Sequence, residues 1–412
     1  MKFGGINIAI KRVILHLGMS KTGTRSIQET LFNNADILKH NGFRYLYEWG
    51  RNHNGKLRHL FSPDPVKPVD STWGKAISPR KHQNDIKKLV EKMLNIINNG
   101  CEGETLLISG ECFHLFFSDL LVENLREFIK NYFISNGLEV SIILLIRNPL
   151  SWTISSLQQK IFNCSYPRNV DFFENRMQIY EAVNNLKKNF PDCITLLKFE
   201  DAILNKDGLV EYFLKAISFP DESIKDFNII RAGESRCMEV IEFVNYVESI
   251  EPLALKNNFE KTNPNRTTKD LWHIRHINGV KFDLPYHSKA ELWERLQKTV
   301  KNLKECAGID YSNYTLSASM TSNETYSEQT IQGFLEAFPK LSPVIQKLFL
   351  KFFEMKYAET AQARFKQLYF KGSAPWRIYN ERNNSFCLLF YRIKNSLRNL
   401  LPQRIKLLVK RI

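Results

Sequence analysis

The hydrophobic residues of the chain gather in short dense runs, with longer segments of helical spacing between them. Four of these runs have the length of a strand and show little alternation of polar and apolar positions. Dense runs of this length are typical of strands that are buried on both faces of a parallel sheet. The pattern therefore predicts four buried parallel strands, at residues 13–17, 105–109, 140–146 and 194–199.

Helical periodicity fills the segments that separate these runs. Residues 24–38 place side chains that include Ile27, Leu31 and Leu38 at steps of three or four positions, and residues 86–97 and 120–133 repeat the spacing. Beyond about residue 207 the pattern is mainly helical. Strands that alternate with helices predict an α/β fold with a doubly wound, mostly parallel sheet, followed by a helical C-terminal half.

Residues 50–84 interrupt this alternation. The segment is rich in proline and basic residues and shows little periodicity, so it is predicted to be a long loop. Loops of this length are uncommon in compact domains and are often functional. His53, His59, Trp73 and His82 fall in this loop and are candidates for contact with a substrate, although each histidine alone also fits a solvated loop residue.

The composition is that of a folded protein larger than a typical single domain. The chain has 412 residues, of which 43% are hydrophobic and 25% are charged. Its cysteines are odd in number and form no CxxC pair, which is typical of reduced thiols and gives no support to a zinc cluster. The first residues, MKFGGINIAIKR, lack the apolar run of a signal peptide. We therefore expect a cytoplasmic protein.

The positive charge of the chain is unevenly distributed. The formal net charge is +15, which favours anionic partners, and residues 385–412 hold seven Lys or Arg without any acid. The rest of the chain is only moderately basic, so we expect no nucleic-acid partner. Residues 386–412 read as a basic amphipathic helix that either binds an anionic membrane surface, such as the inner face of the membrane, or packs on its own domain.

The segment LHLGMSKTGTRSIQETL, residues 15–31, combines a buried strand, a glycine-containing turn and the start of a helix. Gly18 and Gly23 are spaced as in a Walker A phosphate loop, but the lysine, Lys21, precedes the second glycine, and Thr24 and Arg25 follow it. Backbone N–H groups at such a helix N-terminus can converge on an anion. The alternative is an ordinary connection between a strand and a helix.

A second segment, SIILLIRNPLSWTISSLQQ, covers residues 141–159. It ends a predicted strand in Arg147, passes through Pro149 and places Ser155 eight residues after the arginine, on the following helix. A guanidinium forms paired, charge-assisted hydrogen bonds with a phosphate, so Arg147 and Ser155 can hold one phosphate from two sides. A salt bridge at the end of the strand is the alternative for Arg147.

Together these segments resemble the sulfotransferases that use 3′-phosphoadenosine 5′-phosphosulfate (PAPS), in particular the bacterial type. The stretch ITLLKFEDAI, residues 194–203, resembles a third family segment, and order and spacing agree over residues 12–220. The resemblance implies a P-loop NTPase-like sulfotransferase fold. It also implies a sulfotransferase domain at 10–310, a helical extension of that domain at 311–375 and the basic tail at 380–412.

The resemblance also implies roles for individual residues. Lys21 aligns with the lysine at the oxygen that bridges phosphate and sulfuryl group, and the residues after it align with the loop around the 5′-phosphate. Arg147 and Ser155 align with the 3′-phosphate site. The segment NIIRAGESR, residues 228–236, occupies the position of a loop over the 3′-phosphate, although the Arg-Lys-Gly signature of the family is absent. The implied cofactor-binding residues are Lys21, Thr22, Gly23, Thr24, Arg25, Ser26, Arg147 and Ser155, with Arg231, Ser235 and Arg236 as candidates in the 3′-phosphate loop.

A general base must accept the proton of the acceptor, and the family places a Glu or His just after its second strand. Glu111 follows the run at 105–109, and a carboxylate at this edge of the sheet can reach an incoming hydroxyl. A salt-bridged carboxylate is the alternative for Glu111. His114 is a candidate for acceptor contact, but its apolar neighbours favour a packed core histidine. Two histidines and an arginine in DLWHIRHIN, 270–278, lack suitably spaced partners for a metal.

The sequence thus predicts a metal-free transfer of the sulfuryl group from PAPS to a hydroxyl or amine, with PAP as product. The expected acceptor is a carbohydrate in a cell-surface polysaccharide or a glycolipid. Two alternatives remain: a P-loop kinase or related nucleotide enzyme, and a non-catalytic protein of the same fold that binds PAP or a membrane.

Overall fold

The computed structural model describes residues 10–61, 79–163, 178–233, 235–255, 258–267, 269–317 and 326–356. The predictions for Trp73 and for the tail at 386–412 fall outside these residues. The described chain divides into two compact units. The first consists of the described residues within 10–157, 178–233 and 284–317, and the second consists of those within 158–163, 235–283 and 326–356.

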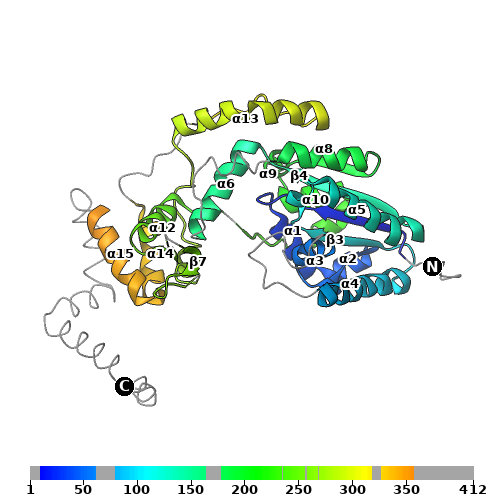
Figure 1. Cartoon of the computed structure of the whole chain (residues 1–412), viewed down its shortest axis with the longest axis horizontal. Coiled ribbons are helices and arrows are strands. Elements are labelled where there is room, and N and C mark those ends of the chain that lie inside the picture. Colours follow the sequence, from blue (N-terminus) through cyan, green and yellow to red (C-terminus); the bar gives the residue numbers. More distant parts are fainter. Residues whose placement is uncertain are drawn as a thin grey trace, which may run out of the picture. The chain divides into compact units, whose positions relative to one another are not determined.

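The first unit is built on a five-stranded parallel sheet with the strand order β2-β3-β1-β4-β5 (Figure 1). The four predicted strands are present, and the sequence analysis missed β2, which is only three residues long. The strands are β1 (Arg12–Leu17), β2 (Phe43–Tyr45), β3 (Thr105–Gly110), β4 (Glu139–Ile146) and β5 (Ile194–Lys198).

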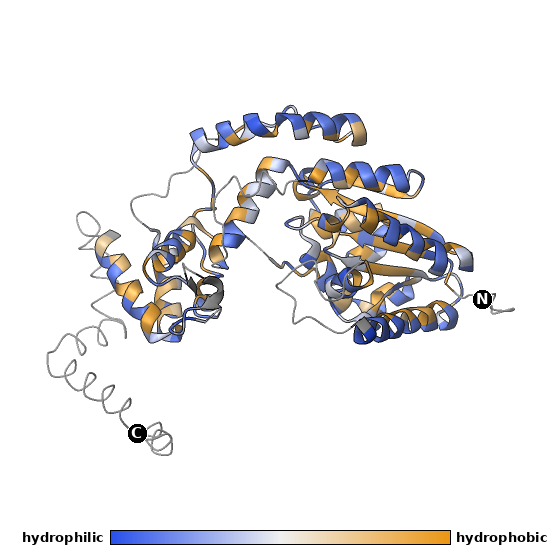
Figure 2. Cartoon of the chain, viewed as in Figure 1, coloured by the Kyte–Doolittle hydropathy of each residue, from blue (hydrophilic) through white to orange (hydrophobic). Residues whose placement is uncertain are grey.

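Alternate side chains of each central strand enter two separate cores, one on each face of the sheet. In β4, Ile142 and Leu144 join the first core, whereas Ile143 and Leu145 join the second. The strands are hydrophobic along most of their length, and the helices around them are apolar mainly on the side that faces the sheet (Figure 2). This is the burial on both faces that the dense apolar runs predicted.

Helices cover both faces of the sheet. The first core receives side chains from α3 (Asn54–Phe61), α4 (Pro79–Asn99), α5 (Asp119–Tyr132), α8 (Ile179–Asn189) and α13 (Tyr286–Ala307), and α13 lies beside α8 (Figure 1). The second core receives side chains from α1 (Thr24–Asn33), α2 (Ala35–His40), α9 (Phe199–Leu204), α10 (Gly208–Ala216) and α11 (Asp221–Ile224). The predicted doubly wound α/β architecture is confirmed.

The prediction of an uninterrupted loop at 50–84 is wrong at both ends of that segment. Helix α3 covers residues 54–61, and α4 begins at Pro79. Leu57 and Phe61 are one turn apart in α3 and are almost completely buried in the first core. This apolar pair anchors the short helix, which lacks the extended apolar periodicity by which longer helices are recognised. Proline is well tolerated at a first helical position, where its missing N–H has no intrahelical acceptor.

The second unit is mainly helical and has an aromatic core of its own. The ring of Phe243 makes edge contacts with Phe334 and Phe349, at centroid distances of 6.0 and 5.4 Å. Of the described residues in the expected extension at 311–375, residues 311–317 belong to the first unit and residues 326–356 pack with residues from 235–283. The elements of this unit are α12 (Met238–Ile250), α14 (Glu328–Ala337), α15 (Pro343–Lys356) and the antiparallel pair β6 (Ala254–Leu255) and β7 (Asn258–Thr262).

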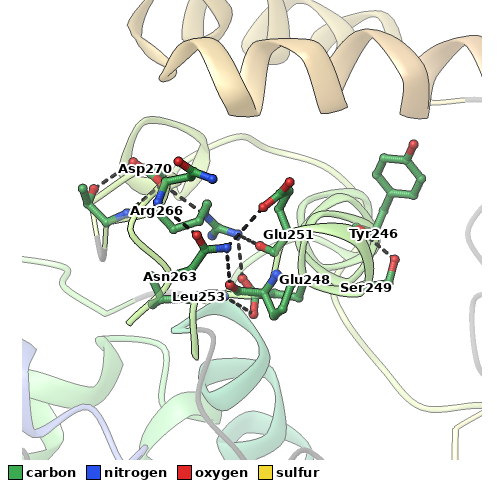
Figure 3. Close-up of polar contacts among 11 residues, drawn as sticks. Tyr246, Glu248, Ser249, Glu251, Leu253, Asn263, Arg266 and Asp270 are labelled. Carbon is green, nitrogen blue, oxygen red and sulfur yellow. Dashed lines mark hydrogen bonds and ion pairs between the residues drawn. The ribbon is translucent and has the colours of Figure 1, made fainter. Parts of the chain in front are cut away.

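A buried arginine organises the polar interior of the second unit (Figure 3). Arg266 forms ion pairs with Glu248 and Asp270, each at 3.0 Å, and its guanidinium also donates to the backbone carbonyl of Glu251. The arginine and both of these carboxylates are buried. The network fixes the chain that follows α12, since charges removed from water need such partners.

The remaining elements are short, apart from α6. Among the helices that the structure describes, none is both long enough and apolar enough to cross a bilayer. Helix α6 covers Pro149–Phe162, and the 3₁₀ helices are η1 (Tyr47–Trp49), η3 (Phe113–Leu115), η4 (Ile134–Asn136), η5 (Trp272–Ile274) and η6 (Phe338–Lys340).

Candidate functional site

The turn between β1 and α1 has a backbone that requires its two glycines. Gly23, which precedes α1, is in the left-handed region with φ 72°, and an added Cβ there would collide with Leu209 of α10. An added Cβ at Gly18 would collide with the side chain of Thr24. Lys21 also adopts a positive φ, 65°, which is uncommon for a residue with a side chain. The turn is therefore a constrained loop rather than an ordinary connection.

Hydroxyl groups brace this loop from within. The side chains of Thr22 and Thr24 both donate to the carbonyl of Met19, at 2.6 and 3.3 Å. The residue that caps α1 is Gly23, which has no side chain that could accept a hydrogen bond from the first N–H groups of the helix. The first backbone N–H groups of a helix have no intrahelical acceptor, so the start of α1 suits an anion. Thr22 and Thr24, expected as cofactor ligands, here shape the loop.

Arg147 joins the end of β4 to this loop. Its Nη1 donates to the carbonyl of Lys21 at 2.7 Å, and its guanidinium lies over the ring of Phe199 at 4.9 Å. Within the described residues its Nε is buried and has no hydrogen-bond partner. Burial lowers the pKa of Arg147, while the carboxylate of Glu200 opposes this shift. The end of β4 therefore places the positive charge of Arg147 next to the loop that contains Lys21.

The residues on either side of Arg147 form hydrogen bonds with two side chains to which the sequence analysis assigned no role. Glu200 Oε1 accepts a hydrogen bond from the backbone N–H of Asn148 at 3.0 Å, and the hydroxyl of Tyr311 donates to the carbonyl of Ile146 at 2.7 Å. Glu200 belongs to the stretch after β5 that had been noted only as a family segment. Ser155 is buried on α6, the helix on which it was predicted.

Glu111 lies on the other side of the loop, directly after β3. Strands β1 and β3 are in parallel register with Leu17 opposite Gly110, and the N–H of Gly18 donates to the carbonyl of Gly110 at 2.7 Å. Asn54, the first residue of α3, contacts Glu111 twice. Its Oδ1 accepts the backbone N–H of Glu111, and its Nδ2 donates to the carboxylate at 3.4 Å. The carboxylate thus stands at the same edge of the sheet as Lys21.

The charge state of Glu111 depends on its burial and on nearby cations. Burial raises the pKa of its carboxyl group, and the positive charges of Lys21, Arg58 and Arg25 lower it, with the largest of these three effects from Lys21. A carboxylate with a raised pKa is a stronger base than an exposed one, and the cations keep its ionised form accessible. Arg58, on α3, was not among the predicted site residues.

A row of polar side chains on α1 holds the segment that had been compared with a 3′-phosphate loop. The pairs are Ser26 with Ala232, Thr30 with Ile230 and Asn34 with Asn228, and each involves the backbone of the second residue. The segment therefore runs antiparallel to α1 and reaches its first turn at Ala232. Ser26, expected as a cofactor ligand, both donates to and accepts from Ala232.

Of the three residues predicted in that loop, one lies beside α1. Arg231 precedes Ala232 in the segment held by α1 and is exposed. Ser235 and Arg236 belong to the second unit, where the guanidinium of Arg236 lies over the ring of Phe162 at 4.8 Å. Of the three, only Arg231 is therefore placed near the start of α1 within the first unit.

The histidines predicted to contact an acceptor differ in their surroundings. His53 is completely buried; its Nδ1 accepts the N–H of Ser109 at 3.0 Å, and its Nε2 contacts the carbonyl of Gly50 at 3.1 Å. Burial lowers the pKa of His53 to about 3. Both ring nitrogens are used within the fold, which leaves none for an acceptor. His59 Nδ1 lies 3.2 Å from Nδ1 of His82, between α3 and α4.

His114 is exposed, in contrast to the packed core position that its apolar neighbours favoured. It lies in the 3₁₀ helix η3, where Phe113 and Leu115 turn inward and the residue between them turns outward. In the basic stretch at 270–278, Arg275 lies over the ring of Trp272 at 4.6 Å. Among the residues that the structure describes, no three His, Cys, Asp or Glu gather as metal ligands, and the metal-free chemistry stays a prediction.

Known proteins resemble this chain in their structures only. No family model matches the sequence, and no curated protein matches it. A sulfotransferase from Alicyclobacillus acidocaldarius is 12% identical, with 58% of this chain and 93% of that chain covered and a TM-score of 0.31. The sulfotransferase domain of the Synechococcus PCC 7002 olefin synthase is also 12% identical, with 71% and 98% covered and a TM-score of 0.29.

A third similar structure is retinol dehydratase in complex with androsterone and the inactive cofactor PAP. It is 14% identical, with 75% of this chain and 85% of that chain covered and a TM-score of 0.30. All three TM-scores lie below 0.5, so any assignment of function depends on the geometry of this chain. What these comparisons add is that two of the similar structures are sulfotransferases by name and that the third holds PAP.

Proposed function

We propose that this protein transfers a sulfuryl group from PAPS to a hydroxyl or amine. One observation carries the proposal: the three predicted chemical groups meet at the carboxyl ends of three adjacent strands. Glu111 follows β3, the loop with Lys21 follows β1, and Arg147 follows β4, in the strand order β3-β1-β4. In parallel α/β sheets this edge is where ligands bind.

The residues at this edge fit the phosphate groups of PAPS. The start of α1 has no side-chain cap, the Arg147 Nε is buried without a partner in the described part of the chain, and Lys21 supplies an ammonium group. Gly18 and Gly23 allow the backbone of the loop to adopt this conformation, because an added Cβ would collide with Thr24 or Leu209. Donors and cations of this kind are suited to an anion.

The residues also fit the transfer chemistry. When bound, PAPS supplies an activated sulfuryl group whose leaving group is PAP. Glu111 accepts the proton of the acceptor hydroxyl, and its raised pKa suits it to this task. Lys21 presents a positive charge at the start of α1, where donors that are already in place stabilise a developing negative charge without reorganisation.

The acceptor is proposed to be a carbohydrate of a cell-surface polysaccharide or a glycolipid. The support for this class is the family resemblance of the sequence, together with the basic residues at 386–412, which suit an anionic membrane surface. On this proposal the protein is cytoplasmic and binds peripherally to the inner face of the membrane.

The experiment that tests the proposal compares donors and acceptors directly. The full chain is incubated with labelled PAPS and a panel of glycans, glycolipids and phenols, with and without Mg²⁺, and PAP binding is measured by calorimetry. We expect PAP binding and transfer to at least one acceptor class in the absence of Mg²⁺. Mg²⁺-dependent turnover of ATP without PAP binding would instead identify a nucleotide enzyme of the kinase type.

A further inference from the structure

A chain of buried polar groups lies behind Glu111, and its last member before Glu111 is Asn54. Gln28 of α1 donates from Nε2 to the carbonyl of Ser109 at 2.9 Å and to Oδ1 of Asn54 at 3.3 Å. The ring nitrogen Nδ1 of His16 lies 2.8 Å from the hydroxyl of Ser109. Asn54, Gln28, Ser109 and His16 are all buried, so each needs the partners that it has.

The orientation of the Asn54 amide follows from these contacts. Its Oδ1 faces two donors, Gln28 Nε2 and the backbone N–H of Glu111, so its Nδ2 is the atom that faces the Glu111 carboxylate. The backbone N–H of Asn54 donates to Oδ1 of Asn52 at 2.8 Å, which fixes the start of α3. One side chain thus holds both the backbone and the carboxylate of Glu111.

We propose that Asn54 is a positioning residue for Glu111, which holds the carboxylate in one direction at the carboxyl edge of the sheet. This inference rests on the proposed function, because the carboxylate has a catalytic role only if sulfuryl transfer takes place. The contact itself is independent of that role. An amide is suited to the position because it offers an acceptor to the N–H of Glu111 and a donor to its carboxylate.

The charged and titratable groups around Glu111 set the direction of the expected changes. Lys21 in the loop, Arg25 on α1 and Arg58 on α3 favour the ionised carboxylate, as does the hydrogen bond from Asn54. The buried thiol of Cys112 is next to it in the chain, and burial raises the pKa of that thiol to about 12, so the thiol stays neutral. Removal of the Asn54 donor therefore moves the titration of Glu111 to higher pH.

The test compares Asn54→Ala and Asn54→Asp with the full-length wild type. The measurements are kcat and KM for PAPS as functions of pH, and the titration of the Glu111 carboxyl by NMR with labelled glutamate, assigned with Glu111→Gln. For Asn54→Ala we expect kcat to fall about tenfold or more while KM for PAPS stays within about twofold, since orientation is lost and donor binding is not. The Glu111 titration and the acid limb of kcat both move to higher pH.

Asn54→Asp keeps the acceptor for the Glu111 N–H and replaces the donor with a second carboxylate. We expect it to fold at least as well as Asn54→Ala, because an acidic residue suits the first turn of α3. Two neighbouring carboxylates disfavour ionisation, so the Glu111 titration moves further upward than in Asn54→Ala. The expected order of the Glu111 pKa is wild type lowest, Asn54→Ala higher and Asn54→Asp highest. A loss of packing alone would not produce this order.

The matched control is Asn124→Ala. The Asn124 amide donates to the carbonyl of Phe61 at 3.1 Å and so holds the other end of α3 without contacting Glu111. We expect its kcat and Glu111 titration to match the wild type. Unchanged values in Asn54→Ala, or equal changes in Asn124→Ala, would overturn the inference. A wild type without any transfer would overturn the proposed function instead, and the Glu111 titrations would still decide whether Asn54 holds the carboxylate.

Discussion

At the scale of single residues, the site places a carboxyl group where burial opposes its charge. Glu111 has a raised pKa mainly because of burial, and the cations Lys21, Arg58 and Arg25 only partly offset that effect. A catalytic base in such surroundings gains basicity at the expense of stability, because the folded chain must hold a poorly solvated charge. We therefore expect the free energy of unfolding to depend on the ionisation of Glu111.

Glu111→Gln is expected to raise the free energy of unfolding near neutral pH. The folded chain holds the Glu111 proton more tightly than the unfolded chain, whose reference pKa is 4.5. Ionisation therefore favours the unfolded state, and stability is lost as the pH rises from this reference value through the raised folded pKa. The glutamine variant lacks this loss.

Urea unfolding of both proteins between pH 4 and pH 8 measures the difference; these two limits are chosen to span roughly the range in which carboxyl groups titrate. We expect the wild type to lose stability relative to Glu111→Gln as the pH rises. A constant difference across the range would mean that Glu111 titrates as it does in the unfolded chain.

Single residues also show how far the sequence could be interpreted. Lys21 and Arg147 were identified because each lies in a segment with a phosphate-binding pattern at the end of a dense apolar strand, and the family resemblance implied their roles. Glu111 was identified because the resembled family places a Glu or His just after its second strand, at the edge of the sheet where ligands bind. Asn54 was missed because its partner, Glu111, is 57 residues away and the sequence around it shows no periodicity. His53 was selected as a loop residue, but the ring of Tyr45 stacks on it and the backbone N–H of Ser109, 56 residues later, donates to its Nδ1.

At the scale of elements, α1 has a second role besides its position after the phosphate-type loop: it holds a distant segment of the chain. One face carries Ser26 and Thr30, Asn34 follows directly after the helix at the same step of four residues, and these three side chains bind the backbone of residues 228–232. The spacing is visible in the sequence, but the sequence analysis did not interpret it. The partner of these side chains is an extended segment about 200 residues later, which local periodicity does not reveal.

Asn34→Ala is expected to destabilise the first unit by about 2 kcal/mol, because it removes a buried side chain and both of its hydrogen bonds with the backbone of Asn228, at about 1 kcal/mol each. The neighbouring Asn33→Ala is the matched control. Asn33 is exposed and its side chain donates to the carbonyl of Glu29 within the same helix, so its loss should change stability by less than about 0.5 kcal/mol.

Chemical unfolding of the two variants measures both values under one set of conditions. Equal losses in Asn33→Ala and Asn34→Ala would contradict the view that the polar face of α1 anchors residues 228–232.

The dense strands, by contrast, were predictable to within one residue at each end, because burial on both faces leaves few polar positions.

At the scale of the whole molecule, the chain forms two compact units that alternate along the sequence. The sequence analysis expected a domain at 10–310, followed by its helical extension at 311–375 and a basic tail at 380–412. Phe243, Phe334 and Phe349 form one core although about 90 residues separate the first two. Helical periodicity gives the buried face of each helix but not the helix that covers it.

Arg266→Met tests the polar interior of the second unit. The substitution keeps most of the side-chain length and leaves Glu248 and Asp270 buried without their cation. Breaking one partner of a buried ion pair typically costs about 3–5 kcal/mol. Hydrogen exchange read by mass spectrometry should show faster exchange in α12 and in residues 258–267, while β1, β3 and β4 keep their protection.

Lys269→Met is the control for this substitution, because Lys269 is exposed and lies in the same stretch of chain. Its exchange pattern should equal that of the wild type. A wild-type pattern in Arg266→Met would mean that the arginine network contributes little to the second unit.

The central claim is that Glu111 and the loop at the start of α1 form one site for sulfuryl transfer. The most direct measurement compares Glu111→Gln with the wild type in two assays, PAP binding by calorimetry and transfer from labelled PAPS. We predict that the variant binds PAP within about threefold of the wild type and transfers at least about a hundredfold more slowly, as loss of a general base implies. Equal transfer rates, or a wild type that binds no PAP, would contradict the account.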